Sequence, residues 1–245
     1  MNAFFAAFLS TLAIVASLEA AERKVPSSSL ASSNISSEPV TISTNLLFQD
    51  RFVGKLDPGW HWLREHKDAW RVSRAGLEVL IEPGNMWGPQ NDARNLLIRP
   101  APEPGKAAIE VAATVENAPT NQYEQADLTW YLDDSNMVKI GEELVDGRLS
   151  VVMGREENDR TRTVSITPLD STRVRLRLHV ESGRITGSFQ AGASRQWQEV
   201  GSCELPKSPK PGETPKIALQ FYQGAPGVEH WARVTDFEVT KLQRP

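Results

Sequence analysis

Apolar and polar residues alternate without a break in VRLRLHV, residues 174–180. Successive side chains of a β-strand point to opposite faces, so the four apolar residues share one face while two arginines and a histidine share the other. The segment therefore predicts a strand with one face in a core and the other toward water or a ligand.

Similar short segments recur from Leu46 onward, separated by clusters of Gly, Pro, Asn and Asp. This spacing is typical of an all-β chain, and no stretch shows a convincing helical period. The predicted strands are residues 47–52, 70–72, 76–81, 95–99, 108–115, 125–132, 137–144, 149–153, 164–167, 174–180, 185–189, 197–202, 217–222 and 234–242. We expect two stacked antiparallel sheets closed as a jelly-roll sandwich.

Residues 125–147 predict a hairpin whose turn is formed by Asp133 to Asn136. If the pairing continues unchanged from that turn, Trp130 lies opposite Lys139 and Asp127 lies opposite Glu142. The two faces of this hairpin differ little in polarity.

The N-terminal part of the chain has a different composition. Residues 1–21 contain the apolar run FFAAFLSTLAIVAS followed by Ala20 and Ala21, which predicts a secretory signal peptide. The first residues carry no Lys or Arg, so an uncleaved membrane anchor is the alternative, and with it the only expected membrane contact. Residues 22–44 are rich in serine and predict a flexible spacer, which leaves 45–245 as the sandwich domain. We expect a secreted, periplasmic or cell-envelope protein.

Charge and cysteine content narrow the functional classes. Cys203 is the only cysteine, so the domain has no internal disulfide and must be held by its core. The formal net charge of −4 argues against nucleic acid as a partner. No glycine-rich phosphate loop leads from a strand into a helix, so we expect no nucleotide ligand.

The segment QADLTWYLDDSNMVKIGEELVDGRLSVVM, residues 125–153, resembles a bacterial family of concanavalin A-like proteins. The matching positions are Ala126 and Leu128, the acidic turn, Lys-x-Gly-x-Glu at 139–143 and Asp-Gly-x-Leu-Ser-Val-Val at 146–152. The family is described as being of unknown function or as "regulation of enolase"-like, and it is similar to the C-terminal β-sandwich of family 43 β-xylosidases. The resemblance runs from FQDRF at Phe48 to TDFEV at Thr235.

Two departures accompany this resemblance. Asp127 stands where the family has glycine, and REENDRT, residues 155–161, replaces a Ser-Asp-Trp-Ser stretch. The resemblance implies a concanavalin A-like lectin/glucanase sandwich. Lectins, carbohydrate-binding modules, glucanases and lyases share this fold, which therefore does not name an activity.

Our leading hypothesis is an exported, non-catalytic protein that binds a poly- or oligosaccharide on its concave sheet. Sugar binding needs exposed aromatic rings that stack on pyranose faces, flanked by polar side chains that bond hydroxyls. The candidates are Trp87, Asn95, Gln125, Trp130, Lys139, Glu143, Arg177, Gln220, Tyr222 and Gln223. The structural alternative places Trp130 between the sheets.

A glycoside hydrolase or polysaccharide lyase that uses Asp127, Glu142 or Glu143 is the alternative from another class. Hydrolysis needs two carboxyl groups about 5 to 9.5 Å apart. The Glu-x-Asp-x-x-Glu string of concanavalin-type glucanases is missing from the chain. A structural envelope protein that contacts another protein is the second alternative.

Two further features have competing interpretations. We expect Trp60, Trp62 and Trp70 to be core or loop anchors rather than a sugar platform, because a buried indole covers a large apolar area. No cofactor is expected. Calcium is the metal that such sandwiches often bind, and Asp50 and Asp236, near the two ends of the domain, are its weak candidate ligands.

Overall fold

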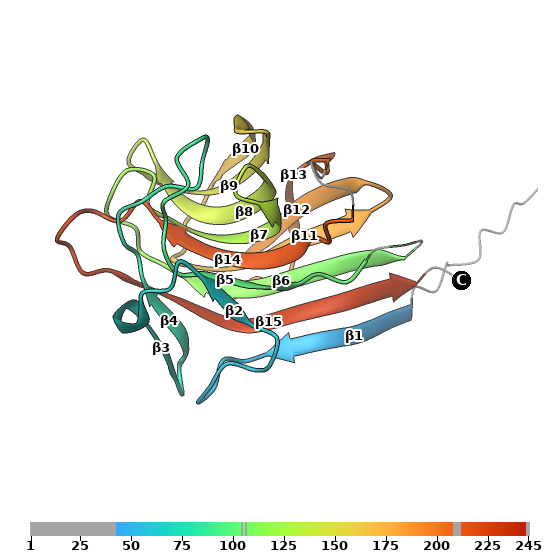
Figure 1. The fold of residues 1–245 in the computed structure, drawn as a ribbon, viewed down its shortest axis with the longest axis horizontal. Helices are drawn as coiled ribbons and strands as arrows, with labels where there is room; N and C mark the ends of the chain where they lie inside the picture. The colour runs from blue at the N-terminus through green and yellow to red at the C-terminus, as the bar shows by residue number, and fades with distance from the viewer. Residues whose placement is uncertain (1–42, 104, 106, 208–211, 244–245) are drawn as a thin grey trace, which may run out of the picture. The chain divides into compact units, whose positions relative to one another are not determined.

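Two antiparallel β-sheets make up the structure, a computed structural model that describes residues 43–103, 105, 107–207 and 212–243 (Figure 1). The predicted signal peptide and nearly all of the predicted spacer lie outside these residues. The first strand begins at Ser43, two residues before the boundary expected for the domain.

Sheet A has eight strands, and the long strand β15 (Trp231–Gln243) lies near its middle. On one side of β15 follow β6 (Ala108–Glu116), β11 (Arg173–Glu181), β12 (Arg184–Ala191) and β13 (Gln198–Glu204). On its other side β15 pairs with β4 (Gly76–Leu80), which is followed by β3 (Trp70–Ser73), and with β1 (Ser43–Asp50).

Sheet B has seven strands in the order β10 (Arg160–Pro168), β9 (Arg148–Glu157), β8 (Asn136–Val145), β7 (Gln125–Asp133), β14 (Lys216–Tyr222), β5 (Leu96–Pro100) and β2 (His61–Leu63). Within the described residues, one 3₁₀ turn, η1 (Lys67–Ala69), precedes β3. The sandwich expected from the alternating segments is confirmed, and every predicted strand has a counterpart. Only β2 and η1 are unpredicted, because three residues are too few to show a period.

The main core lies between the inner faces of the two sheets. Leu176 and Leu178 of β11 and Leu128 and Trp130 of β7 all belong to it and are at most 2% exposed. In β11 the burial alternates along the strand as the sequence pattern predicts. Burying apolar area of this kind is the main source of stability in a domain without disulfides.

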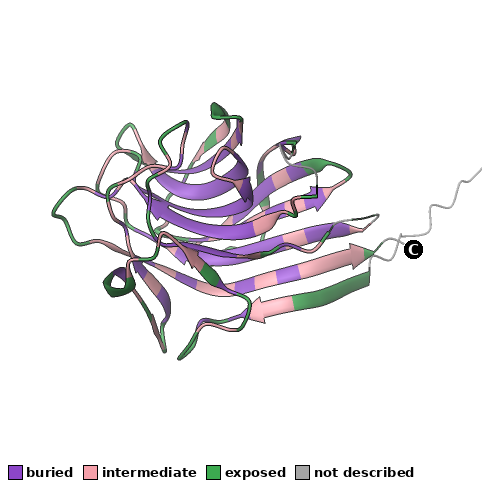
Figure 2. Ribbon diagram, viewed as in Figure 1, coloured by how far each residue is buried: buried purple, intermediate pink, exposed green. Residues whose placement is uncertain are grey.

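Sheet B differs from sheet A because its outer face is also covered. Strands β7 and β8 are buried almost along their whole length, whereas β15 alternates between buried and half-buried residues (Figure 2). The cover comes from the connection between β4 and β5, where Met86 and Ala93 pack on Tyr131, Met137 and other residues of a second, smaller apolar cluster. Only part of this outer face is therefore open.

The register predicted for the β7–β8 hairpin is correct at its turn and wrong beyond it. Asp133 pairs with Asn136, but a bulge follows, and Tyr131 pairs with Met137 instead of Val138. As a result Lys139 lies opposite Thr129, not Trp130. A bulge inserts one unpaired residue and moves every later side chain to a new partner.

Trp60, Trp62 and Trp70 are core or loop anchors, as the sequence predicts. Trp60 is 8% exposed and packs among Phe48, Phe52 and Phe237, with ring centroids 4.9 to 6.2 Å from its own. Trp62 and Trp70 are half-buried, and their rings lie 4.9 Å apart at the edge of the main core. These indoles anchor the segment that leads from β1 to β3.

Candidate functional site

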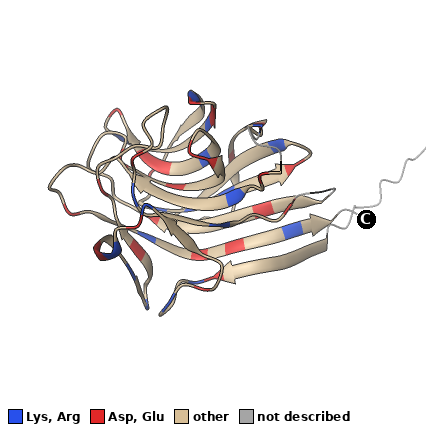
Figure 3. Cartoon of the chain, viewed as in Figure 1, with Lys and Arg blue, Asp and Glu red and all other residues tan. Residues whose placement is uncertain are grey.

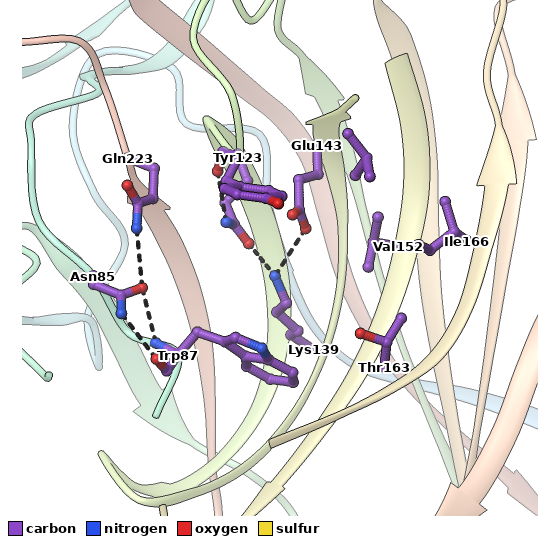
Figure 4. A pocket seen from close by; sticks show the side chains of 11 residues that line it. Asn85, Trp87, Tyr123, Lys139, Glu143, Val152, Thr163, Ile166 and Gln223 are labelled. Carbon is purple, nitrogen blue, oxygen red and sulfur yellow. Dashed lines mark hydrogen bonds and ion pairs between the residues drawn. The ribbon is translucent and has the colours of Figure 1, made fainter. Parts of the chain in front are cut away.

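A pocket of about 410 Å³ opens on the outer face of sheet B, and we call it the outer-face pocket (Figure 4). This volume falls in the range of small-molecule sites. Its lining residues are Asn85, Trp87, Tyr123, Gln125, Lys139, Glu143, Val145, Val152, Thr163, Ile166 and Gln223. Strands β7 to β10 form the floor and one wall, and loops form the rest.

Lys139 lies at the centre of the floor with only 3% of its side chain exposed. Its ammonium group donates to Oε1 of Gln125, to Oε2 of Glu143 at 3.1 Å and to the hydroxyl of Tyr222 at 3.3 Å. The carboxylate of Asp127 lies 3.6 Å away. The acidic neighbours raise the pKa of Lys139 and outweigh the opposing effect of burial, so the ammonium stays charged.

Asp127 fits beneath this network because its neighbour on β8 is a glycine. A Cβ atom on Gly141 would stand 1.6 Å from Oδ1 of Asp127, so a side chain there would displace the carboxyl group. Burial raises the pKa of Asp127 to about 6, against the opposing effect of Lys139. Asp127 is 1% exposed, so it supports the floor without reaching the ligand space.

Trp87 forms one wall, and a second glycine determines its position. A Cβ atom on Gly154 would stand 2.5 Å from Cη2 of Trp87, so the indole lies directly on the β9 backbone. The carboxylate of Glu156 accepts the backbone N–H of Gly88 at 3.2 Å, and the Asn85 amide bonds both backbone groups of Trp87. The loop that carries Trp87 is thus tied to sheet B.

Two other lining residues have left-handed backbone conformations. The φ angles of Tyr123 and Gln223 are 66° and 65°, which non-glycine residues adopt at a cost and which often occur at functional sites. The Asn121 side chain donates to the backbone oxygen of Gln223 at 2.9 Å and so links the two loops. Tyr123 is 49% exposed, and its ring faces the pocket beside Glu143 (Figure 4).

The structure brings together about half of the sugar-binding candidates. Trp87, Gln125, Lys139, Glu143 and Gln223 line the outer-face pocket. Tyr222 contacts the floor through Lys139. Gln220 points to the same face of sheet B but is fully buried, and its amide donates to the sulfur of Met137.

The other three candidates lie elsewhere. Trp130 is 2% exposed and belongs to the main core, on the opposite face of β7. It therefore lies between the sheets, which was the structural alternative to sugar binding. Asn95 braces a loop, because its amide bonds both backbone groups of His66. Arg177 lies on the outer face of sheet A, 4.1 Å above the ring of Trp197.

The outer face of sheet A carries interleaved charges, and Glu78, Glu116 and Arg233 line a more polar hollow of about 380 Å³ on it. Arg177 pairs with Glu110 at 3.3 Å, and Arg175 with Glu238 at 2.6 Å. Both signs of charge occur along β15 (Figure 3).

Sequence reasoning missed six lining residues: Asn85, Tyr123, Val145, Val152, Thr163 and Ile166. The three on β9 and β10 share the face of Lys139 and Glu143, because Lys139 is aligned with Gly154 and Thr163, and Gly141 with Val152 and Ile166. A correct register would have placed them there. Asn85 and Tyr123 lie in loops, where no periodic signal exists.

The three alternative catalytic carboxyl groups do not share one environment. Glu143 lines the pocket, Asp127 is enclosed beneath it, and Glu142 points to the inner face of the sheet. The pairing of Asp127 with Glu142 expected from the sequence is wrong, because the bulge aligns Asp127 with Gly141 and Glu142 with Ala126. Burial raises the pKa of Glu142 to about 9.

The calcium candidates lie at neighbouring positions, since Asp50 pairs with Phe237, the residue after Asp236. The carboxylate of Asp50 accepts the N–H groups of Phe52 at 2.6 Å, Asp57 at 3.1 Å and the Trp60 indole at 2.9 Å. It therefore caps a turn. In the described part of the chain, no three His, Cys, Asp or Glu side chains form a group that could hold a metal ion.

Among the residues that the structure describes, none of the helical segments is long and apolar enough to cross a lipid bilayer.

Solved structures show which folds the chain is similar to. The GH43 BlXynB protein from Bacillus licheniformis superposes with a TM-score of 0.66 at 16% identity, over 80% of this chain and 39% of that one. A xylan β-1,4-xylosidase from Bacillus halodurans gives a TM-score of 0.65 at 16% identity, with the same coverage. The carbohydrate-binding module CBM66 from Bacillus subtilis gives 0.51 at 12% identity, over 74% of this chain and 94% of that module.

The chain thus matches about 39% of the length of these Bacillus enzymes. No curated protein sequence matches the chain significantly. The sequence model of the β-xylosidase C-terminal concanavalin A-like domain matches residues 49–209, which include most of both sheets and the lining residues up to Ile166. The chain therefore belongs to the family of β-xylosidase C-terminal concanavalin A-like domains.

Proposed function

We propose that this protein binds a carbohydrate in the outer-face pocket without changing it chemically. The observation that carries the proposal is the combination of two aromatic rings, Trp87 and Tyr123, with a polar floor in one pocket of about 410 Å³. Aromatic faces stack on the C–H faces of sugar rings, while a few fixed polar groups orient the hydroxyls. Ligand sites of proteins generally have this mixture of apolar walls and converging polar groups.

The polar groups are fixed before a ligand arrives. Lys139 holds Gln125 and Glu143 on the floor, and Gln223 donates to Asn85 at 3.3 Å on the wall. Such fixed side chains lose little conformational freedom on binding, which favours affinity. The fold is also that of CBM66, a protein described as a carbohydrate-binding module.

Binding without chemistry agrees with the positions of the carboxyl groups. Glycoside hydrolysis needs two carboxyl groups on either side of the scissile bond. Glu143 lines the pocket, whereas Asp127 and Glu142 are 1% and 0% exposed. A ligand in the pocket therefore meets only Glu143 of these three.

Affinity electrophoresis against a panel of soluble polysaccharides tests the proposal. We expect retardation by at least one polysaccharide and its loss in Trp87→Ala. Trp197→Ala is the matched control, because Trp197 is a half-buried tryptophan that packs with Arg177 on sheet A. Tyr123→Ala, at an exposed loop position, gives a second test in case the Trp87 variant folds poorly. Equal retardation of the Trp87 and Trp197 variants, with intact circular dichroism, would refute the assignment of the pocket.

We further propose that the chain is exported and acts in a secreted, periplasmic or cell-envelope location, as residues 1–21 predict. The mass of the mature protein from its native host checks this. A mature chain that still begins at Met1 and remains in the cytoplasmic fraction would contradict it.

A further inference from the structure

We propose that the outer-face pocket selects uncharged or amine-bearing glycans and rejects glycans that carry carboxylate, sulfate or phosphate groups. This inference rests on the proposed function, since it names the chemical class of ligand for the same pocket. It follows from which polar atoms around the pocket are already bonded and which are left for a ligand.

The one cation that lines the pocket has no hydrogen left to offer. An ammonium group has three N–H donors, and Lys139 directs them at Gln125, Glu143 and Tyr222. With 3% of its side chain exposed, Lys139 also has almost no surface in the pocket. No arginine or second lysine belongs to the lining. An anionic ligand would thus find no free cationic donor.

None of the remaining polar groups that line the pocket carries a positive charge. Glu143 uses Oε2 for Lys139, which leaves Oε1 to the pocket. Gln223 uses one hydrogen of its NH₂ group for Asn85, which leaves the second hydrogen and its carbonyl oxygen. The hydroxyl groups of Tyr123 and Thr163 can donate or accept. A ligand that donates hydrogens, such as a sugar hydroxyl or a protonated amine, therefore meets a carboxylate oxygen here, whereas an anionic ligand meets only neutral donors.

The charge balance of the site points the same way. The Lys139 ammonium is shared by Glu143 at 3.1 Å and Asp127 at 3.6 Å, so the floor has two carboxyl groups for one cation. Glu156, which is fully buried, adds a further carboxyl group beside the Trp87 loop. A ligand carboxylate brought near Oε1 of Glu143 would meet a like charge inside a half-enclosed space, where such repulsion is large.

The test compares pairs of oligosaccharides that differ in charge: xylo- with glucuronoxylo-oligosaccharides, and galacto- with galacturono-oligosaccharides. Isothermal titration at low salt should show that within any pair that binds, the acidic member binds at least tenfold more weakly. Glu143→Gln should reduce this ratio of affinities, since it removes the negative charge that lines the pocket and leaves Lys139 less neutralised. Glu199→Gln, an equal change of charge at an exposed position of β13, should leave the ratio unchanged.

The possible outcomes separate the two proposals. If acidic members bind as tightly as their neutral partners, the charge selectivity is wrong and the proposed function stands. If no oligosaccharide of either kind binds, the proposed function itself fails and the selectivity fails with it. If the ratio is large but Glu143→Gln does not reduce it, the selectivity arises elsewhere and the role assigned to Glu143 is refuted.

Discussion

Replacing Glu142 by glutamine should stabilise the protein, and the gain should increase with pH. Glu142 is 0% exposed on the inner face of β8, and neither carboxyl oxygen has a hydrogen-bond partner. Burial alone raises its pKa from 4.5 to about 9. The folded protein therefore keeps this carboxyl group protonated at neutral pH, while the unfolded chain ionises it.

The size and sign of the effect follow from proton linkage. Because the folded pKa is raised, the stability associated with the protonated group is fully present below pH 4.5 and is lost progressively up to about pH 9. Each pH unit in this window costs about 1.4 kcal/mol of unfolding free energy. At pH 7 the cost is about 3 kcal/mol, a large share of the stability of a typical domain. Glutamine has a similar shape and does not ionise.

Urea unfolding followed by tryptophan fluorescence measures the difference between Glu142→Gln and the wild type at several pH values. The chain contains seven tryptophans, which provide the signal. We expect the two proteins to be nearly equally stable at pH 5 and the variant to be more stable by several kcal/mol at pH 8.

The comparison isolates Glu142 from other groups whose pKa is raised, such as Asp127 and Glu156, because these are present in both proteins. The exposed variant Glu199→Gln is the control and should change stability by less than about 0.5 kcal/mol at every pH. A stability difference between Glu142→Gln and the wild type that does not vary from pH 5 to pH 8 would refute the reasoning. It would mean that Glu142 is ionised in the folded state.

Three further predictions concern packing and the ion network around Lys139. Gly154→Ala should displace the Trp87 indole, because the new Cβ would stand 2.5 Å from the ring. The variant should lose about 1–3 kcal/mol of unfolding free energy and show a shifted tryptophan emission. Unchanged emission and stability would contradict this. Lys139→Met should cost about 3–5 kcal/mol at pH 7, since it leaves the buried Asp127 carboxylate unpaired. The cost should be smaller at pH 5, because burial raises the pKa of Asp127 to about 6 and this group then takes up a proton. Urea unfolding at both pH values checks this, and an equal loss at both would count against the ion network. Trp60→Ala should cost about 3–5 kcal/mol in the same assay, because it empties the centre of an aromatic cluster; a loss below about 1 kcal/mol would show that this indole is not a core anchor.

The strands and their inner faces could be predicted from the sequence because they depend on local geometry. In residues 174–180 the alternation of side chains follows directly from an extended backbone, and burial in the structure repeats it. In β7 the alternation placed Leu128 and Trp130 on one face but did not say which face is buried, and Trp130, one of the sugar-binding candidates, lies in the core. The resemblance in residues 125–153 added the family, which the match over residues 49–209 confirms.

The pocket could be predicted only in part. Gln125, Lys139 and Glu143 stand close together along one hairpin, so their shared polarity is visible in the sequence. The residues that pair with them across the hairpin could not be predicted, because one bulge between Tyr131 and Asp133 shifts the whole register. Polar residues on both faces of the hairpin gave no pattern that would reveal the shift.

Local patterns in the amino-acid sequence thus determined the strands, the two-layer fold and the polar floor, because each depends on neighbours along the chain. The tertiary structure alone decided that the outer face of sheet B is half covered and where it stays open. Loop residues such as Trp87 and Tyr123 line the open part. Their positions depend on Gly154 and Asn121 and on contacts with strands that are distant in the sequence. Such contacts have no period, so only the folded chain reveals them.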